Sequence, residues 1–157
     1  MPAFQNDQFA GLPGIDTAVT TIESVITWGA PEQQVVVGIP IKGTARDAGH
    51  SGNTTILRPG LLMGVIKAER LAKEWNSGAA DGSEVIAGPL LYAVNTQKDG
   101  SDATRWFGYI LVRGLVQASK IIIPGQANPG IDGVGSEATV RSGLATRFVL
   151  DDMFFLA

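Results

Sequence analysis

The chain has 157 residues, a net charge of −3, no cysteine and one histidine. This length fits one domain with a hydrophobic core of its own. The absence of cysteine excludes disulfides, thiolate nucleophiles and cysteine-bound metals. No cluster of Lys and Arg is present, so nucleic acid is not an expected partner, because binding to phosphates needs grouped cations. No apolar run approaches the ~18 residues that a membrane span requires, and no signal peptide is evident, so synthesis and use in a host cytoplasm are expected.

The first sixteen residues predict an extended N-terminal arm. Single apolar residues, Phe4, Phe9, Leu12 and Ile15, are separated by polar residues, glycine and proline. A segment of this kind cannot form its own core, so we expect residues 1–16 to order only against a partner. A frayed terminus is the alternative.

The next segments favour strands. Most residues in 17–28 are β-branched, which favours a strand, although the spacing of some apolar residues also permits a helix. Residues 34–41 are rich in valine and isoleucine and predict a clearer strand. Residues 45–54 carry glycine, serine, asparagine and His50 and predict an exposed loop.

The central region predicts two more strands with local irregularities. Residues 61–66 form an apolar strand in which Gly64 indicates a bulge or a close backbone approach. Residues 84–94 form another, and Pro89 places it at a sheet edge or at a bend, because proline lacks a ladder donor. Residues 67–75, between them, are expected to be a strand or a helical turn.

The last third of the chain predicts two strands over residues 106–123, meeting at Gly114, and then a loop. Ser136 is suited to cap a short helix on which Val140 and Leu144 share a face.

A final strand is expected over residues 148–156. Many short strands and glycine-rich loops predict a mainly β fold, a compact barrel-like domain over residues 17–157 with one or two short helices.

The polar residues favour no catalytic, cofactor or metal site. His50 lies in a glycine loop that is poorly preorganised for catalysis, and we interpret it as a solvated side chain. Asp151 and Asp152 would point to opposite faces of a strand. Asp99 and Asp102 lack the ligand series of a calcium loop. We therefore expect a protein that is not an enzyme.

The bulky aromatic side chains are expected to fill the core or a subunit interface. An aromatic platform for sugars or bases is the alternative. These residues are Trp28, Trp75, Trp106, Phe107, Tyr109, Phe154 and Phe155.

Three glycine-containing phrases resemble a known family. They are Arg58-Pro59-Gly60 at the start of a strand, Asp81 to Val85 continued by Gly88 and Leu90-Leu91, and Val112-Arg113-Gly114, interpreted as a hairpin. Their order and spacing resemble the phage head decoration proteins of the lambda protein D family. The resemblance covers about residues 55–123 and, more loosely, 136–150.

The resemblance implies a β-rich domain, often placed among β-clip folds, that forms a homotrimer on the outer surface of a phage head. Its partner would be the major capsid protein, and its function would be to stabilise the expanded shell against the pressure of packaged DNA. The N-terminal arm would order on the shell, with Phe4, Phe9, Leu12 and Ile15 as capsid contacts. About 54 residues precede the similar region, and this long N-terminal extension departs from the family pattern. The alternatives are a tail or fibre adhesin module and, further behind, a nucleotide-hydrolysing β-clip enzyme.

Overall fold

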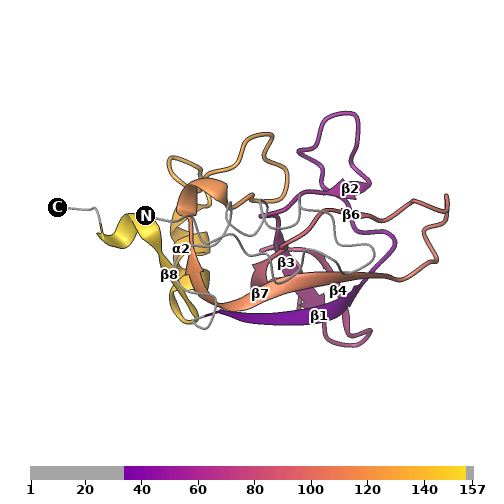
Figure 1. Cartoon of the computed structure of the whole chain (residues 1–157), viewed down its shortest axis with the longest axis horizontal. Helices are drawn as coiled ribbons and strands as arrows, with labels where there is room; N and C mark the ends of the chain where they lie inside the picture. The colour runs from indigo at the N-terminus through magenta and orange to yellow at the C-terminus, as the bar shows by residue number, and fades with distance from the viewer. Residues whose placement is uncertain (1–33, 155–157) are drawn as a thin grey trace, which may run out of the picture.

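The computed structural model of the chain describes residues 34–154. The predicted arm and the predicted strand at residues 17–28 lie outside the described residues. Within them, the fold is mainly β and is built on a six-stranded sheet (Figure 1). In sheet order the strands are β5 (Ile86–Pro89), β3 (Leu62–Ile66), β4 (Leu71–Glu74), β1 (Val35–Ile41), β7 (Trp106–Val116) and β8 (Phe148–Leu150).

Small elements surround this sheet. Strands β2 (Ile56–Leu57) and β6 (Val94–Asn95) pair as a separate two-stranded ribbon. The α-helix α2 (Glu137–Ala145) and the 3₁₀ helices η3 (Ala118–Lys120) and η4 (Asp151–Phe154) complete the described chain. Figure 1 shows α2 and β8 together at one end of the sheet, with the β2–β6 ribbon toward the other end.

The sheet curls into a half-barrel. The segment after β5 approaches β7, where Leu90 pairs with Ile110 and the Leu91 N–H donates to the Tyr109 carbonyl at 2.9 Å. Gly88 permits this approach, because a Cβ added to it would lie 1.8 Å from the Leu111 carbonyl oxygen. The structure thus confirms the mainly β, barrel-like fold, with one short α-helix among the described residues.

Two hydrophobic clusters lie on opposite faces of the curled sheet. Leu62 and Met63 are neighbours on β3 and both are fully buried, one in each cluster. The first cluster packs under α2 through Val140 and Leu144, as the sequence predicted. The central strands are therefore buried on both faces, which explains their continuous apolar runs.

Several local predictions are confirmed. The strand predicted for residues 34–41 is β1. Pro89 lies on β5, an edge strand of the sheet. The register between β3 and β5 shifts between Met63 and Gly64, where Ala87 of β5 is the extra residue. Gly64 itself makes the expected close backbone approach, since an added Cβ would lie 2.3 Å from the Ser83 carbonyl oxygen. Ser136 occupies the N-cap position of α2, but its side chain donates or accepts no capping hydrogen bond.

Three predicted strand boundaries are wrong. No hairpin forms at Gly114. β7 continues through it to Val116, because Gly114 adopts a φ of 147° and pairs with Phe148 of β8. The strand predicted for residues 84–94 is limited to β5. The final strand ends at Leu150, because the Asp151 carboxylate accepts the Ala118 N–H at 2.8 Å and the chain turns into η4.

Candidate interaction surface

One side of the β1–β7 pair carries an apolar surface that the described residues leave exposed. Gly38 lies opposite Tyr109 and Pro40 lies opposite Phe107, and directly opposed residues share a face of the sheet. Val36 lies on the same side, two residues before Gly38. We call this surface, composed of Val36, Gly38, Pro40, Phe107 and Tyr109, the aromatic face.

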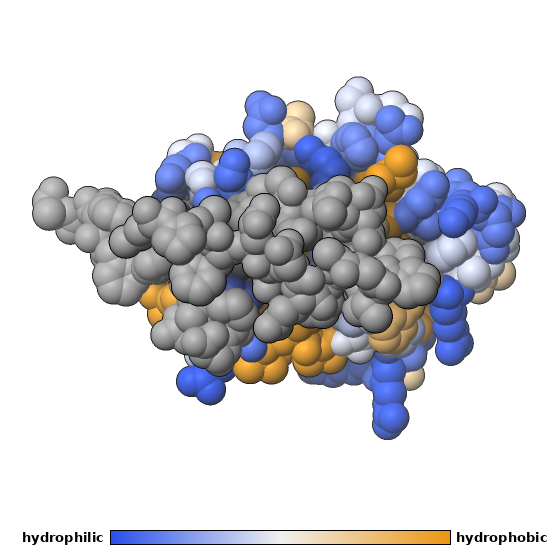
Figure 2. Space-filling view, in the orientation of Figure 1, coloured by the Kyte–Doolittle hydropathy of each residue, from blue (hydrophilic) through white to orange (hydrophobic). Residues whose placement is uncertain are grey.

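The aromatic face is exposed to an unusual degree for its residue types. Phe107 is 61% exposed, Tyr109 46% and Val36 43%. The space-filling view shows hydrophobic surface over β1 (Figure 2). Single exposed apolar residues are common, whereas neighbouring ones on a single face indicate a binding surface.

The rings of this face are held by one another and by a glycine. Phe107 and Tyr109 meet edge to face, with ring centroids 5.6 Å apart and an angle of 87°. The half-buried Tyr92 contacts Tyr109 in the same way at 5.9 Å and 88°. Phe107 also covers Gly38, where an added Cβ would lie 2.5 Å from its ring. Because the paired rings are perpendicular, they do not form the single flat platform on which sugars or bases stack.

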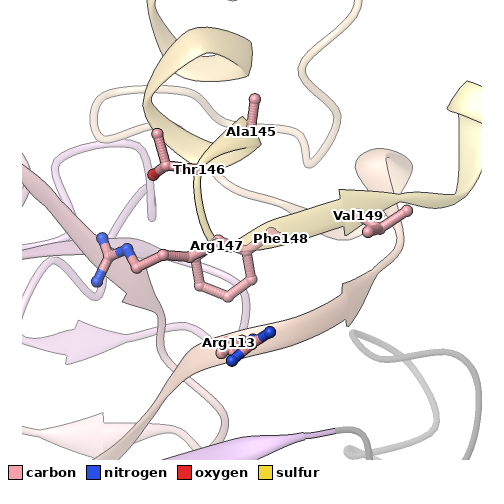
Figure 3. Close-up of a pocket in the computed structure, with 6 residues that line it drawn as sticks. All are labelled: Arg113, Ala145, Thr146, Arg147, Phe148 and Val149. Atoms are coloured by element: carbon pink, nitrogen blue, oxygen red, sulfur yellow. The ribbon is translucent and has the colours of Figure 1, made fainter.

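A hollow of about 440 Å³ lies beside β8 and the end of α2 (Figure 3). Two arginines, Arg113 and Arg147, are among its lining residues. Arg147 donates to the Ile86 carbonyl, and its guanidinium lies 5.8 Å from the Phe148 ring. In Figure 3 its side chain extends away from Arg113. The two cations therefore do not converge on one point as a built anion site requires.

The aspartates considered for calcium binding are engaged by hydrogen-bond donors. Asp99 accepts hydrogen bonds from the Thr104 hydroxyl, the largest cause of its lowered pKa, and from the Ser101 N–H. The pKa of Asp102 is lowered first by the Gln97 amide and then by Arg46. Over residues 34–154, no group of three or more His, Asp or Glu side chains is placed to hold a metal ion.

His50, Asp151 and Asp152, the other polar residues considered from the sequence, do not form a site together. His50 lies in a loop, as predicted, but it is half-buried, and its Nδ1 lies 3.0 Å from the Ile56 carbonyl oxygen. Asp151 accepts from Ala118, whereas Asp152 pairs with Arg141. The two carboxylates bind different partners, although the chain there is a 3₁₀ helix instead of the predicted strand.

The predicted capsid contacts, Phe4, Phe9, Leu12 and Ile15, lie outside the described residues. The aromatic face was not identified from the sequence as a site. The sequence feature that points to this face is the alternation of Phe107 and Tyr109 on either side of Gly108, which is buried. Such alternation shows that the two rings share a face but does not tell whether that face is covered.

The sequence matches no protein-family model and has no significant match among curated proteins. The longest helix in the described part of the chain is α2, and none there is of a length and hydropathy suited to crossing a membrane.

Proposed function

We propose that the chain is a structural decoration protein of a phage head. It binds the major capsid protein on the outer surface of the expanded shell and stabilises the shell against the pressure of packaged DNA. It acts by binding, without catalysis, and assembles as a homotrimer after synthesis in the host cytoplasm. The order and spacing of the glycine-containing phrases support membership of the lambda protein D family. The aromatic face is the structural observation that supports binding to another protein.

The aromatic face has the composition of the centre of a protein–protein interface. Aromatic residues are enriched there and charged residues are depleted. None of the five residues of the face is charged, and the two rings hold each other in place. A rigid aromatic pair loses little conformational entropy on binding, which makes Phe107 and Tyr109 suitable anchors.

The mechanism requires only preferential binding. A ligand that binds the expanded shell better than the unexpanded shell stabilises the expanded form by the difference in binding free energy. A trimer engages three sites at once, so weak individual contacts give durable attachment. An N-terminal arm that adds a strand to an exposed sheet edge gains main-chain hydrogen bonds without a shaped pocket.

Two measurements test the proposal. Light scattering gives the native mass, and a trimer is expected. The protein is then mixed with expanded and unexpanded empty heads of the phage that encodes it and sedimented. Sedimentation with expanded heads alone supports the proposal. Failure to bind either form contradicts it, and binding to host cells or hydrolysis of nucleotides would favour the adhesin or the enzyme.

A further inference from the structure

Three hollows form a row between β5 and β8, the two terminal strands of the six-stranded sheet. The hollow of about 440 Å³ in Figure 3 is the middle one. It shares Arg113 and Val149 with a hollow of about 200 Å³ beside β7, and it shares Thr146 with a hollow of about 390 Å³ beside β3 and β5. Arg147 lines all three. We call this row the seam groove.

The charged side chains that line the seam groove are all cations. They are Arg113, Arg147 and Lys67, and none of the described residues that line the groove is an aspartate or a glutamate. Arg113 and Lys67 are exposed, and neither forms a salt bridge with another residue of the described range. Because the chain as a whole carries a charge of −3, this positive charge is local. Its complement is a negatively charged ligand.

Apolar side chains line the groove between these cations. Leu115 and Val149 lie at the β7 end, and Val85 and Ile86 lie at the β5 end. Val149 is 38% exposed and Val85 is 58% exposed, so both ends offer apolar surface to a ligand. Phe148 lines the middle hollow (Figure 3). A small inorganic anion or a phosphate backbone has no use for such surface, whereas a protein segment can combine carboxylates with apolar side chains.

We propose that the seam groove binds an extended segment of another protein in which carboxylates flank an apolar side chain. The end of α2 lines the middle hollow, and its carbonyl groups carry partial negative charge, so the apolar side chain lies there. The flanking carboxylates reach Arg113 on one side and Lys67 on the other, which explains why the cations do not converge on one point. Arg147 ties the two walls together, since it precedes β8 and donates to the Ile86 carbonyl of β5.

An extended segment also suits the strand at this end of the groove. β8 pairs with β7 on one edge, and its other edge has no strand partner within residues 34–154. Main-chain groups on such an edge can bond to a segment laid beside them. The seam groove shares no residue with the aromatic face, so this binding does not depend on the proposed capsid role.

Selection of random displayed peptides on the immobilised full chain tests the proposal. Enriched peptides are expected to carry Asp or Glu on both sides of an aliphatic residue. Lys67→Glu combined with Arg113→Glu should weaken binding of the synthesised peptides by about 10-fold or more. Lys98→Glu combined with Arg105→Glu is the matched control, because it changes the net charge equally at exposed residues that do not line the groove. No enrichment, enrichment of peptides without acidic residues, or equal weakening by both pairs would overturn the proposal.

NMR titration of the unmodified chain with the tightest selected peptide locates the site without any substitution. The amide shifts of Lys67, Arg113, Thr146 and Val149 are expected to change, and those of the aromatic face are expected to stay constant. Changes confined to the aromatic face would place the peptide there and overturn the proposal. A single-stranded DNA oligonucleotide is titrated in parallel. Equal affinity for this oligonucleotide would assign the groove to phosphates and would also overturn the proposal.

Discussion

Arg58, which is half-buried, and Asp47, which is fully buried, form a bidentate ion pair that joins three loops. The Asp47 carboxylate is fully buried and accepts hydrogen bonds from Arg58 Nε at 2.6 Å and Nη2 at 3.0 Å. The guanidinium also donates to the carbonyls of Ala127 and Gln126 at 2.6 and 2.7 Å. Arg58, which belongs to the Arg58-Pro59-Gly60 phrase, therefore connects the loop before β2 to the loop after η3.

Replacing Asp47 with asparagine should strongly destabilise the fold. The change leaves the half-buried Arg58 guanidinium, whose side chain is 18% exposed, without its counter-ion. Loss of one partner of a fully buried pair typically costs about 3–5 kcal/mol, and we expect a loss at the lower end, about 3 kcal/mol, because Arg58 keeps some contact with solvent. Urea denaturation measures the loss of unfolding free energy. Glu69→Gln is the control, since it breaks the exposed Lys42–Glu69 pair and should cost less than about 1 kcal/mol. Equal losses in the two variants would show that the buried pair has no special role.

Gly88→Ala should disrupt the closure of the half-barrel. The new Cβ would lie 1.8 Å from the Leu111 carbonyl oxygen, at a φ of 153° that disfavours side chains. We expect a loss of about 3 kcal/mol or more, at the upper end of overpacking effects. Gly135→Ala meets no atom within 4 Å and should change the unfolding free energy by less than about 1 kcal/mol. A Gly88→Ala protein as stable as the control would contradict the close β5–β7 contact.

The ion-pair cluster at Arg141 should make stability depend on acid pH. Arg141 pairs with Asp132, Glu137 and Asp152. Its hydrogen bond is the largest cause of the lowered pKa of Glu137, followed by that of the Gly133 N–H. A group whose pKa is lowered by folding stabilises the fold above its unfolded pKa, about 4.3 for glutamate, and this stabilisation is lost as the pH falls through the folded pKa.

Arg141→Met should therefore reduce the acid dependence of unfolding. Urea midpoints are measured from pH 7 to pH 2.5, and the difference between variant and unmodified protein should shrink as the pH falls below about 4. Arg105→Met is the control, since Arg105 is exposed and forms no salt bridge with another residue in the described range 34–154. A pH-independent difference would show that Arg141 contributes by packing alone.

The aromatic face should be needed for binding and not for folding. Phe107→Ser combined with Tyr109→Ser is expected to weaken binding to expanded heads at least 30-fold, the effect of losing an interface anchor of about 2 kcal/mol. The unfolding free energy should change by only about 1 kcal/mol, since Phe107 is 61% exposed and Tyr109 46% exposed. Val85→Ser is the matched control, because Val85 is 58% exposed and lies outside the face. Unchanged binding by the double variant would remove this face from the interface.

The arm should add affinity through its apolar residues. Deleting residues 1–16, or replacing Phe4, Phe9, Leu12 and Ile15 together with serine, should weaken co-sedimentation with expanded heads while leaving the thermal unfolding midpoint unchanged. Replacement of the arm's polar residues Gln5 and Gln8 with serine is the control. If the truncated chain binds as the full chain does, the arm is not a capsid contact.

The parts of the fold that depend on local pattern could be predicted from the sequence. β-branched residues identify β1, and the spacing of Val140 and Leu144 identifies α2 with its buried face. Pro89 correctly indicates an edge strand. The hairpin predicted at Gly114 is wrong because the sequence does not distinguish two uses of glycine. A turn and an irregular position within a strand can both require a positive φ, which other residues disfavour.

The contacts between distant segments could not be predicted. Arg58 lies 11 residues from Asp47 but 68 residues from Gln126, and no local pattern relates such positions. The exposure of Phe107 and Tyr109 likewise depends on the curl of the sheet, which buries Ile110 and Leu111 on opposite faces of the same strand. The aromatic face is therefore a property of tertiary structure that alternation along β7 only hints at.

The most direct test of the proposed function is the thermal stability of phage heads. DNA-filled expanded heads that lack the protein are heated with increasing concentrations of it, and DNA release is followed by a dye that cannot enter intact heads. Because binding to the intact shell stabilises it by mass action, the release temperature should rise progressively with protein concentration. The Phe107→Ser, Tyr109→Ser protein should require a much higher concentration for the same rise. An unchanged release temperature at saturating protein would contradict the account.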